Sequence, residues 1–190
     1  MLRRTVLQWM ASAVAALPLA RVRVAAQAGG LTPDAIATLR EIGRTVLPAS
    51  LGDAGIDAAV ERFVAWTRGY REGVPLAHGY GRPRLRFTPP SPVPAYIAQL
   101  AALDRAARAH GERLGALDLE TRRALVDEAL TRAGVDRLPR RPAGQHVVAD
   151  LMGHYFSSSE ALDRCYRAYI GREKCRPIPV TTVRPRPLTG

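Results

Sequence analysis

Apolar residues recur along most of the chain at the three- and four-residue spacing of an amphipathic α-helix. The first stripe follows Thr32-Pro33, which is typical of a helix N-cap and first helical position, and it ends before Pro48. The other stripes cover residues 56–64, 96–114, 125–130, 147–156 and 161–170. Because no segment shows a strong alternation of apolar and polar residues, we predict an all-α fold. It should be a compact bundle of about six helices with a long Pro-rich loop and an extended C-terminal tail.

The last two stripes carry the most detailed expectations. Ser157-x-x-Glu160 has the pattern of a capping box and predicts the start of the final helix, which Gly171 would end. The predicted inward residues of this helix are Ala161, Leu162, Cys165, Tyr166, Tyr169 and Ile170. Val147, Val148, Leu151, Met152, Tyr155 and Phe156 are the corresponding residues of the helix before it.

The least helical segment runs from Val74 to Pro94 and contains six prolines. About 20 residues is long for a loop inside a compact domain, and such loops are often functional. We interpret the segment as an arm that wraps a partner, the alternative being an ordered crossover on the surface. Nearby aromatic and basic residues predict the contact, although core filling is the favoured role for the tryptophan. They are Trp66, Tyr70, Tyr80 and Arg82.

The N-terminal residues have the organisation of a twin-arginine export signal. Arg3 and Arg4 precede an apolar run of about 15 residues, which is short of the ~20 that span a bilayer. Ala26-Gln27-Ala28 predicts cleavage after Ala28, and cleavage after Ala26 is the alternative, as is an uncleaved leader. We therefore divide the chain into a signal peptide (1–28), a helical domain (29–176) and a Pro-rich tail (177–190). The twin-arginine route carries folded proteins across the membrane, so the predicted location of this chain is the periplasm.

Charge and cysteine content narrow the possible partners. The formal net charge is +11, and it falls to +7 without the four arginines of residues 1–28. The remaining arginines are scattered among acids and the aromatics are few, so we expect no nucleic-acid partner. A solvated surface, an acidic protein or an anionic membrane face fits this charge better.

Cys165 and Cys175 are the only cysteines, and in an oxidising compartment they predict a disulfide. On the chain-entropy model a bridge closing so short a loop contributes roughly 2–3 kcal/mol. Metal binding is the weaker alternative, because the pair lacks the spacing of a zinc site.

Candidate chemistry is sparse. His146, Asp150 and His154 fall on one helix face, but the two histidines would lie ~12 Å apart along the axis, too far to share one ion. Polar surface or an interhelical hydrogen bond therefore explains them better than a metal. His78-Gly79-Tyr80-Gly81 lacks the third glycine and the preceding strand of a nucleotide-binding loop. We assign no catalytic, cofactor-binding or metal-binding residue and expect the chain not to be an enzyme.

Two segments resemble a known family. The run Leu39-Arg-Glu-Ile-Gly-Arg-Thr-Val-Leu-Pro48 looks like the start of the gluconate 2-dehydrogenase subunit 3 family, and His154-Tyr155-Phe156 is similar to its late segment. The stretch from Cys165 to Cys175 departs from the glycine- and proline-rich ending of that family.

The resemblance implies a non-catalytic small subunit that escorts, exports and stabilises a flavin-dependent dehydrogenase of the glucose-methanol-choline type. FAD would belong to that large subunit, and a c-type cytochrome would accept the electrons. Arg3 and Arg4 match the export signal of the family, and any membrane association would come through partners. The alternative is an independent periplasmic helical module that binds a small ligand or metal through the face of His146 and His154.

Overall fold

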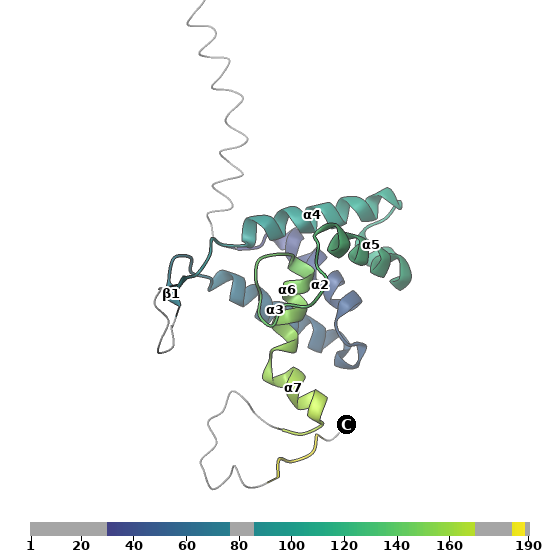
Figure 1. Cartoon of the computed structure of the whole chain (residues 1–190). Helices are drawn as coiled ribbons and strands as arrows, with labels where there is room; N and C mark the ends of the chain where they lie inside the picture. The colour runs from purple at the N-terminus through teal and green to yellow at the C-terminus, as the bar shows by residue number, and fades with distance from the viewer. Residues whose placement is uncertain (1–29, 77–85, 170–183, 189–190) are drawn as a thin grey trace, which may run out of the picture.

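The computed structural model describes residues 30–76, 86–169 and 184–188, and most of them lie in α-helices (Figure 1). The helices are α2 (Pro33–Val46), α3 (Gly52–Arg68), α4 (Val93–Ala109), α5 (Leu119–Arg132), α6 (Val147–Phe156) and α7 (Ser159–Tyr166). Two 3₁₀ turns, η1 (Ala49–Leu51) and η2 (Leu114–Ala116), and two short strands, β1 (Pro75–Leu76) and β2 (Arg86–Phe87), complete the described elements. The all-α class is therefore confirmed.

Helix α6 occupies the centre of the molecule (Figure 1), where it contacts α2, α3, α4 and α5. Its first five residues, 147–151, are all buried, so this half of the helix is covered on every side. A surface helix would instead bury a single stripe. The predicted inward residues are confirmed at Val147, Val148, Leu151 and Tyr155. The prediction that Phe156 faces inward is wrong. This residue follows the buried turns of α6 and is 45% exposed.

Helices α2 and α3 pack closely together, and both the N-cap of α2 and the apolar stripe of α3 that the sequence predicts are confirmed. The Thr32 hydroxyl caps α2 by accepting a hydrogen bond from the Ala35 amide at 3.2 Å. At Gly43 the two helices approach so closely that a Cβ atom would lie 3.0 Å from Val60. The predicted stripe of α3 is buried in full, at Ile56, Ala59, Val60, Phe63 and Val64.

The predicted third helix is shorter than its apolar pattern. Helix α4 ends at Ala109, and Gly111 then adopts a left-handed conformation with φ of +93°. Glycine enters this region without steric cost, so the chain turns there. Leu114 stays buried as predicted, but from η2 and not from α4. Asp118 caps α5, since its carboxylate accepts from the Thr121 amide at 2.9 Å.

The predicted final helix is wrong at both ends. Ser158, not Ser157, is the N-cap of α7, and its hydroxyl accepts from the Ala161 amide at 3.2 Å. The helix stops at Tyr166 because Arg167 is left-handed, with φ of +50°. Of the predicted inward residues only Ala161 is buried, whereas Cys165, Tyr166 and Tyr169 are exposed. Residue 170 and Gly171 lie outside the described residues.

Residues 184–188, from the predicted tail, run back along the end of α7. The amide of Tyr169 donates to the carbonyl of Arg186 at 2.9 Å, and the amide of Leu188 donates to that of Arg167 at 3.1 Å. Ala168 and Pro187 form an antiparallel bridge between them. The described part of the tail therefore makes backbone contacts, and the division of the chain into three segments stays a prediction.

Candidate partner-binding surface

A small antiparallel hairpin projects to one side of the helices between α3 and α4 (Figure 1). Pro75 pairs with Phe87, and Leu76 pairs with Arg86. It occupies part of the Pro-rich segment. The segment is also shorter than predicted, because α4 already begins at Val93.

The base of the hairpin is fastened by Thr88. Its amide donates to the carbonyl of Val74 at 2.9 Å, and its hydroxyl accepts from the Val74 amide at the same distance. The Tyr70 hydroxyl donates to the carbonyl of Pro89 at 3.0 Å, and the Ser91 amide donates to the Glu72 carboxylate at 3.0 Å. These bonds hold the two ends of the hairpin together where it leaves α3 and enters α4.

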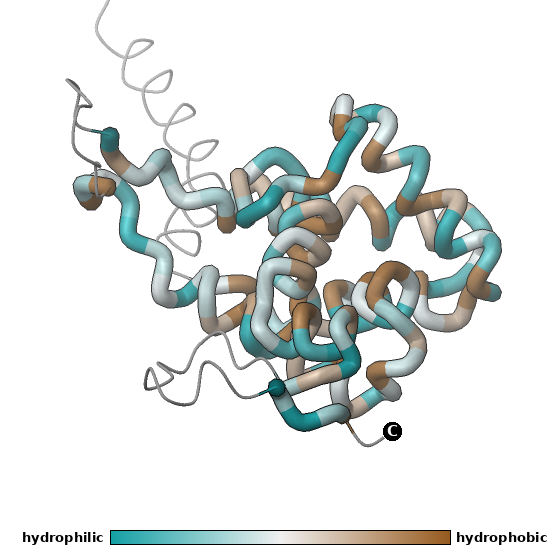
Figure 2. The backbone as a smooth tube through the Cα atoms, turned by 60° about the horizontal axis from the view of Figure 1, so that its bottom comes forward, coloured by the Kyte–Doolittle hydropathy of each residue, from teal (hydrophilic) through white to brown (hydrophobic). Residues whose placement is uncertain are grey.

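The hairpin carries large apolar side chains that no described element covers. Val74 is 42% exposed, Leu76 is 43% exposed and Phe87 is 54% exposed. Figure 2 shows hydrophobic residues, coloured brown along the backbone, on the hairpin and well outside the helices. The register places Phe87 on the face of Pro75 and Leu76 on the face of Arg86, so the exposed apolar side chains lie on both faces of the hairpin. Exposed large apolar residues gathered on one arm are typical of interaction sites.

An aromatic cluster joins this hairpin to the core. The ring of Trp66 stacks on Phe63 at 5.5 Å between centroids and meets the edge of Tyr70 at 5.5 Å. Phe63 is fully buried, whereas Trp66 and Tyr70 are half-buried. Trp66 therefore fills the core on one side, as one of its two predicted roles requires, and leaves part of its ring accessible.

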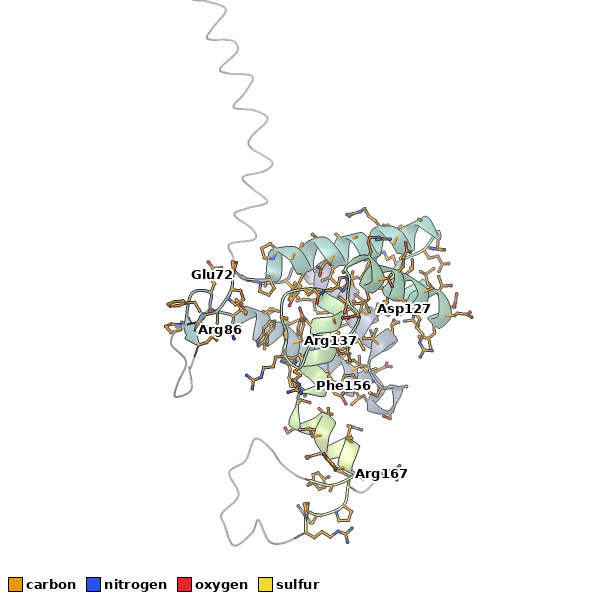
Figure 3. The ribbon with its side chains drawn as sticks, in the orientation of Figure 1. Glu72, Arg86, Asp127, Arg137, Phe156 and Arg167 are labelled. Carbon is orange, nitrogen blue, oxygen red and sulfur yellow. The ribbon has the colours of Figure 1, made fainter. Side chains whose placement is uncertain are left out.

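The charges around the hairpin are mainly positive. Arg68, Arg71 and Arg86 are exposed, against one exposed carboxylate on the same side, Glu72 (Figure 3). None of the three arginines has an ion-pair partner within the described residues. Exposed apolar side chains beside arginines without ion-pair partners favour an acidic protein surface as the complement of the hairpin.

Of the two roles predicted for Asp150, polar surface is wrong. It is fully buried on α6, and its carboxylate accepts from the Tyr96 hydroxyl at 2.7 Å and from the amides of Ala143 and Gly144 at 2.7 and 2.8 Å. Burial first, and then the bond to Asp150, raise the pKa of Tyr96 far above its ordinary value, so the hydroxyl remains a donor. The interhelical hydrogen bond, one of the two predicted roles, is confirmed for this residue.

The two histidines of the predicted face do different things. His146 is buried and caps α6, because its Nδ1 atom accepts from the Val148 amide at 3.3 Å. His154 is half-buried, and its ring meets the edge of Phe63 at 5.6 Å. Within residues 30–76, 86–169 and 184–188, no group of three His, Cys, Asp or Glu residues is arranged to hold a metal ion.

Acidification is expected to destabilise the fold through these histidines. Burial lowers the pKa of His154, with nearby Arg62 adding to the effect, and burial also lowers the pKa of His146 despite the opposing charge of Asp150. The unfolded chain, with histidine pKa values near 6.5, then binds more protons than the folded chain below that pH. The free energy of unfolding should therefore fall as the pH drops from 6.5 toward the folded-state pKa values.

Urea unfolding at about pH 7 and about pH 5.5 measures this loss. His154→Phe keeps an aromatic ring beside Phe63 and removes one titrating group, so it should lose less stability over the same interval. Equal losses in the variant and the parent would contradict the assignment.

Several predicted residues lie outside the described parts of the chain. They are Arg3 and Arg4 of the export signal, Tyr80 and Arg82 of the partner-binding set, and Cys175 of the disulfide. Cys165 is exposed near the end of α7, so its pairing with Cys175 stays a prediction.

The sequence analysis missed the exposed apolar residues of the hairpin and the carboxylate cradle at Asp150. Apolar residues on both sides of the glycine-containing run 78–81 were the available signal for the hairpin. The cradle had no local signal, because Tyr96 lies 54 residues from Asp150. No described helix is both long enough and apolar enough to cross a bilayer. Comparisons with protein-family models, curated proteins and solved structures found no match to this chain.

Proposed function

We propose that this chain is a non-catalytic helical subunit that escorts, exports and stabilises a flavin-dependent dehydrogenase in the periplasm, with the hairpin as its docking surface. The observation that carries the docking part is the exposure of Val74, Leu76 and Phe87 on an arm outside the core. Burial of such side chains in an interface is favourable by about 25 cal/mol per Å² of apolar surface. The exposed apolar surface of the hairpin is therefore stabilised when a partner covers it.

The identity of the partner comes from the sequence. The twin-arginine pattern at Arg3 and Arg4 belongs to proteins that cross the membrane folded, and the resemblance to gluconate 2-dehydrogenase subunit 3 names a flavoprotein of the glucose-methanol-choline type. FAD is expected in that large subunit, and a c-type cytochrome would be the electron acceptor. The exposed arginines beside the hairpin, Arg71 and Arg86, would face acidic groups of the large subunit.

Co-purification tests the proposal. The full chain, tagged at its C-terminus and expressed in its native host, should bring a flavin-containing protein out of the periplasmic fraction. Flavin fluorescence after denaturation measures the amount. Phe87→Ser should weaken this capture by about 30-fold, because a central aromatic anchor contributes about 2 kcal/mol or more to an interface.

Leu119→Ser is the matched control. Leu119 is 40% exposed at the start of α5, away from the hairpin, so its substitution should leave the captured flavin unchanged. Recovery of the wild-type chain from the periplasm as a monomer without flavoprotein would refute the proposal. Equal capture by the Phe87 variant would refute the hairpin as the docking surface while leaving the escort role standing.

A further inference from the structure

A cavity of about 270 Å³ lies between α4 and α5, at the start of α6. These helices run side by side at one end of the molecule (Figure 1). Two buried leucines, Leu103 and Leu125, belong to its lining. Its hollow shape comes from small side chains, since four alanines line it where larger residues would fill the space. They are Ala102 and Ala106 on α4, Ala129 on α5 and Ala133, the residue that follows α5.

The cavity contains one polar group that is suited to hold a ligand. His146 lines it and is only 4% exposed. Its Nδ1 atom accepts from the Val148 amide, so the proton of the neutral ring belongs on Nε2. Among the described residues, no group accepts a hydrogen bond from Nε2. In the described parts of the chain only Arg122 Nε is a fully buried side-chain donor without a partner, so Nε2 of His146 is open to the cavity, where a ligand acceptor would take the place of water.

The neighbouring Gln99 fixes the position of this donor without competing for it. Its side-chain oxygen accepts from the Val147 amide at 2.8 Å, and its side-chain nitrogen donates to the carbonyl of Gln145 at 3.1 Å. These two bonds tie the residues on both sides of His146 to α4. The imidazole is therefore held by backbone on either side and does not depend on a ligand for its place.

The electrostatics of the cavity favour a neutral ligand. Burial lowers the pKa of His146, which leaves the ring uncharged at neutral pH. At the rim, Glu128 and Arg132 form an ion pair with each other, so neither charge is left over for an ionic ligand. Size sets a further limit, because a dry apolar cavity of about 150 Å³ holds a benzene molecule.

We propose that this cavity binds a small neutral molecule, with a single ring or a short branched chain and one carbonyl oxygen that accepts from Nε2 of His146. The apolar body would lie among the four alanines and the two leucines. This ligand-binding proposal is independent of the hairpin and of the partner protein proposed to bind there.

Acetophenone and α-methylstyrene, two probes of nearly the same shape, test the inference on the purified full chain. Only acetophenone has an oxygen that can accept from Nε2. We expect it to bind about three- to tenfold more tightly, because one such hydrogen bond contributes about 0.5–1.5 kcal/mol. Titration followed by the His146 imidazole resonances measures both affinities.

Two variants locate the binding. Ala106→Leu fills the cavity and should abolish binding of both probes, while Ala98→Leu, at an exposed position of α4 that does not line the cavity, should leave both affinities unchanged. His146→Phe should make the two probes equal. If that variant fails to fold, the comparison of probes in the parent and in Ala106→Leu still decides. Absence of acetophenone binding, equal affinities in the parent, or binding that survives Ala106→Leu would overturn the proposal.

Discussion

Replacement of Asp150 by alanine is expected to lower the free energy of unfolding by about 3–5 kcal/mol. The carboxylate is fully buried and accepts hydrogen bonds from the Tyr96 hydroxyl and from the amides of Ala143 and Gly144. Alanine would leave all three donors without this acceptor, and the fully buried Tyr96 hydroxyl could not turn to water instead. Because whole domains are stable by about 5–15 kcal/mol, urea unfolding should show a large shift of the midpoint.

Asp127→Ala is the matched control, because Asp127 is exposed on α5 (Figure 3). Its substitution should change stability by less than about 0.5 kcal/mol. Tyr96→Phe keeps the buried ring and removes only one donor, so a loss of about 1–2 kcal/mol is expected. A loss below about 1 kcal/mol in Asp150→Ala would mean that desolvation of the carboxylate cancels its hydrogen bonds.

Substitution of Gly153 by alanine is the second large effect, with an expected loss of about 2–3 kcal/mol. The α5–α6 loop (residues 133–146) passes so close to α6 that a Cβ atom on Gly153 would lie 2.6 Å from the carbonyl oxygen of Pro139. A backbone atom cannot rotate away as a side chain can, so the loop or the helix must shift. This cost exceeds the gain of about 1 kcal/mol that alanine brings to a helix interior.

Gly69→Ala provides the comparison. Gly69 follows α3 in a right-handed conformation, and an added Cβ would make only ordinary contact, 3.5 Å from the carbonyl oxygen of Ala65. This variant should be neutral or slightly stabilising in the same urea experiment. If Gly153→Ala behaved in the same way, the close approach of Pro139 to α6 would be contradicted.

The two large effects should not add. Asp150 binds the loop at Ala143 and Gly144, and Gly153 accommodates it at Pro139, so both substitutions release the same segment from α6. Residues that share a structural unit show interaction energies of about 0.5–3 kcal/mol in double-mutant cycles. The double variant is therefore expected to lose less stability than the two single losses combined.

Local signals explain why much of the fold could be predicted from the sequence. The N-caps at Thr32 and Asp118 require only a side-chain oxygen and an amide three residues later. The stripe of α3 is buried in full, since a helix of this length must bury an apolar face. The prediction that the third helix extends to Leu114 is wrong, because the apolar spacing continues through a turn that Gly111 imposes. The predicted end of the final helix is wrong, because Arg167 adopts the left-handed conformation that usually favours glycine.

The candidate sites depended on contacts between distant segments, which periodicity does not encode. His146 and Asp150 share one helix, but their partners differ, since His146 caps its own helix whereas Asp150 binds Tyr96 of α4. The cavity beside His146 arises only when the alanines of α4 and α5 come together. Exposure of Phe87 likewise depends on the hairpin pairing away from the helices.

Helix α6 is synthesised late, yet it is the element around which α2, α3, α4 and α5 assemble. When the first 132 residues have been synthesised, the described helices α2 to α5 are complete, but the helix that packs against all four of them is not. Contacts between segments so far apart along the chain form slowly, and the waiting intermediates expose apolar surface. We therefore expect the contacts around α6 to form only after α6 itself has been synthesised, with chaperone engagement falling in the interval before it.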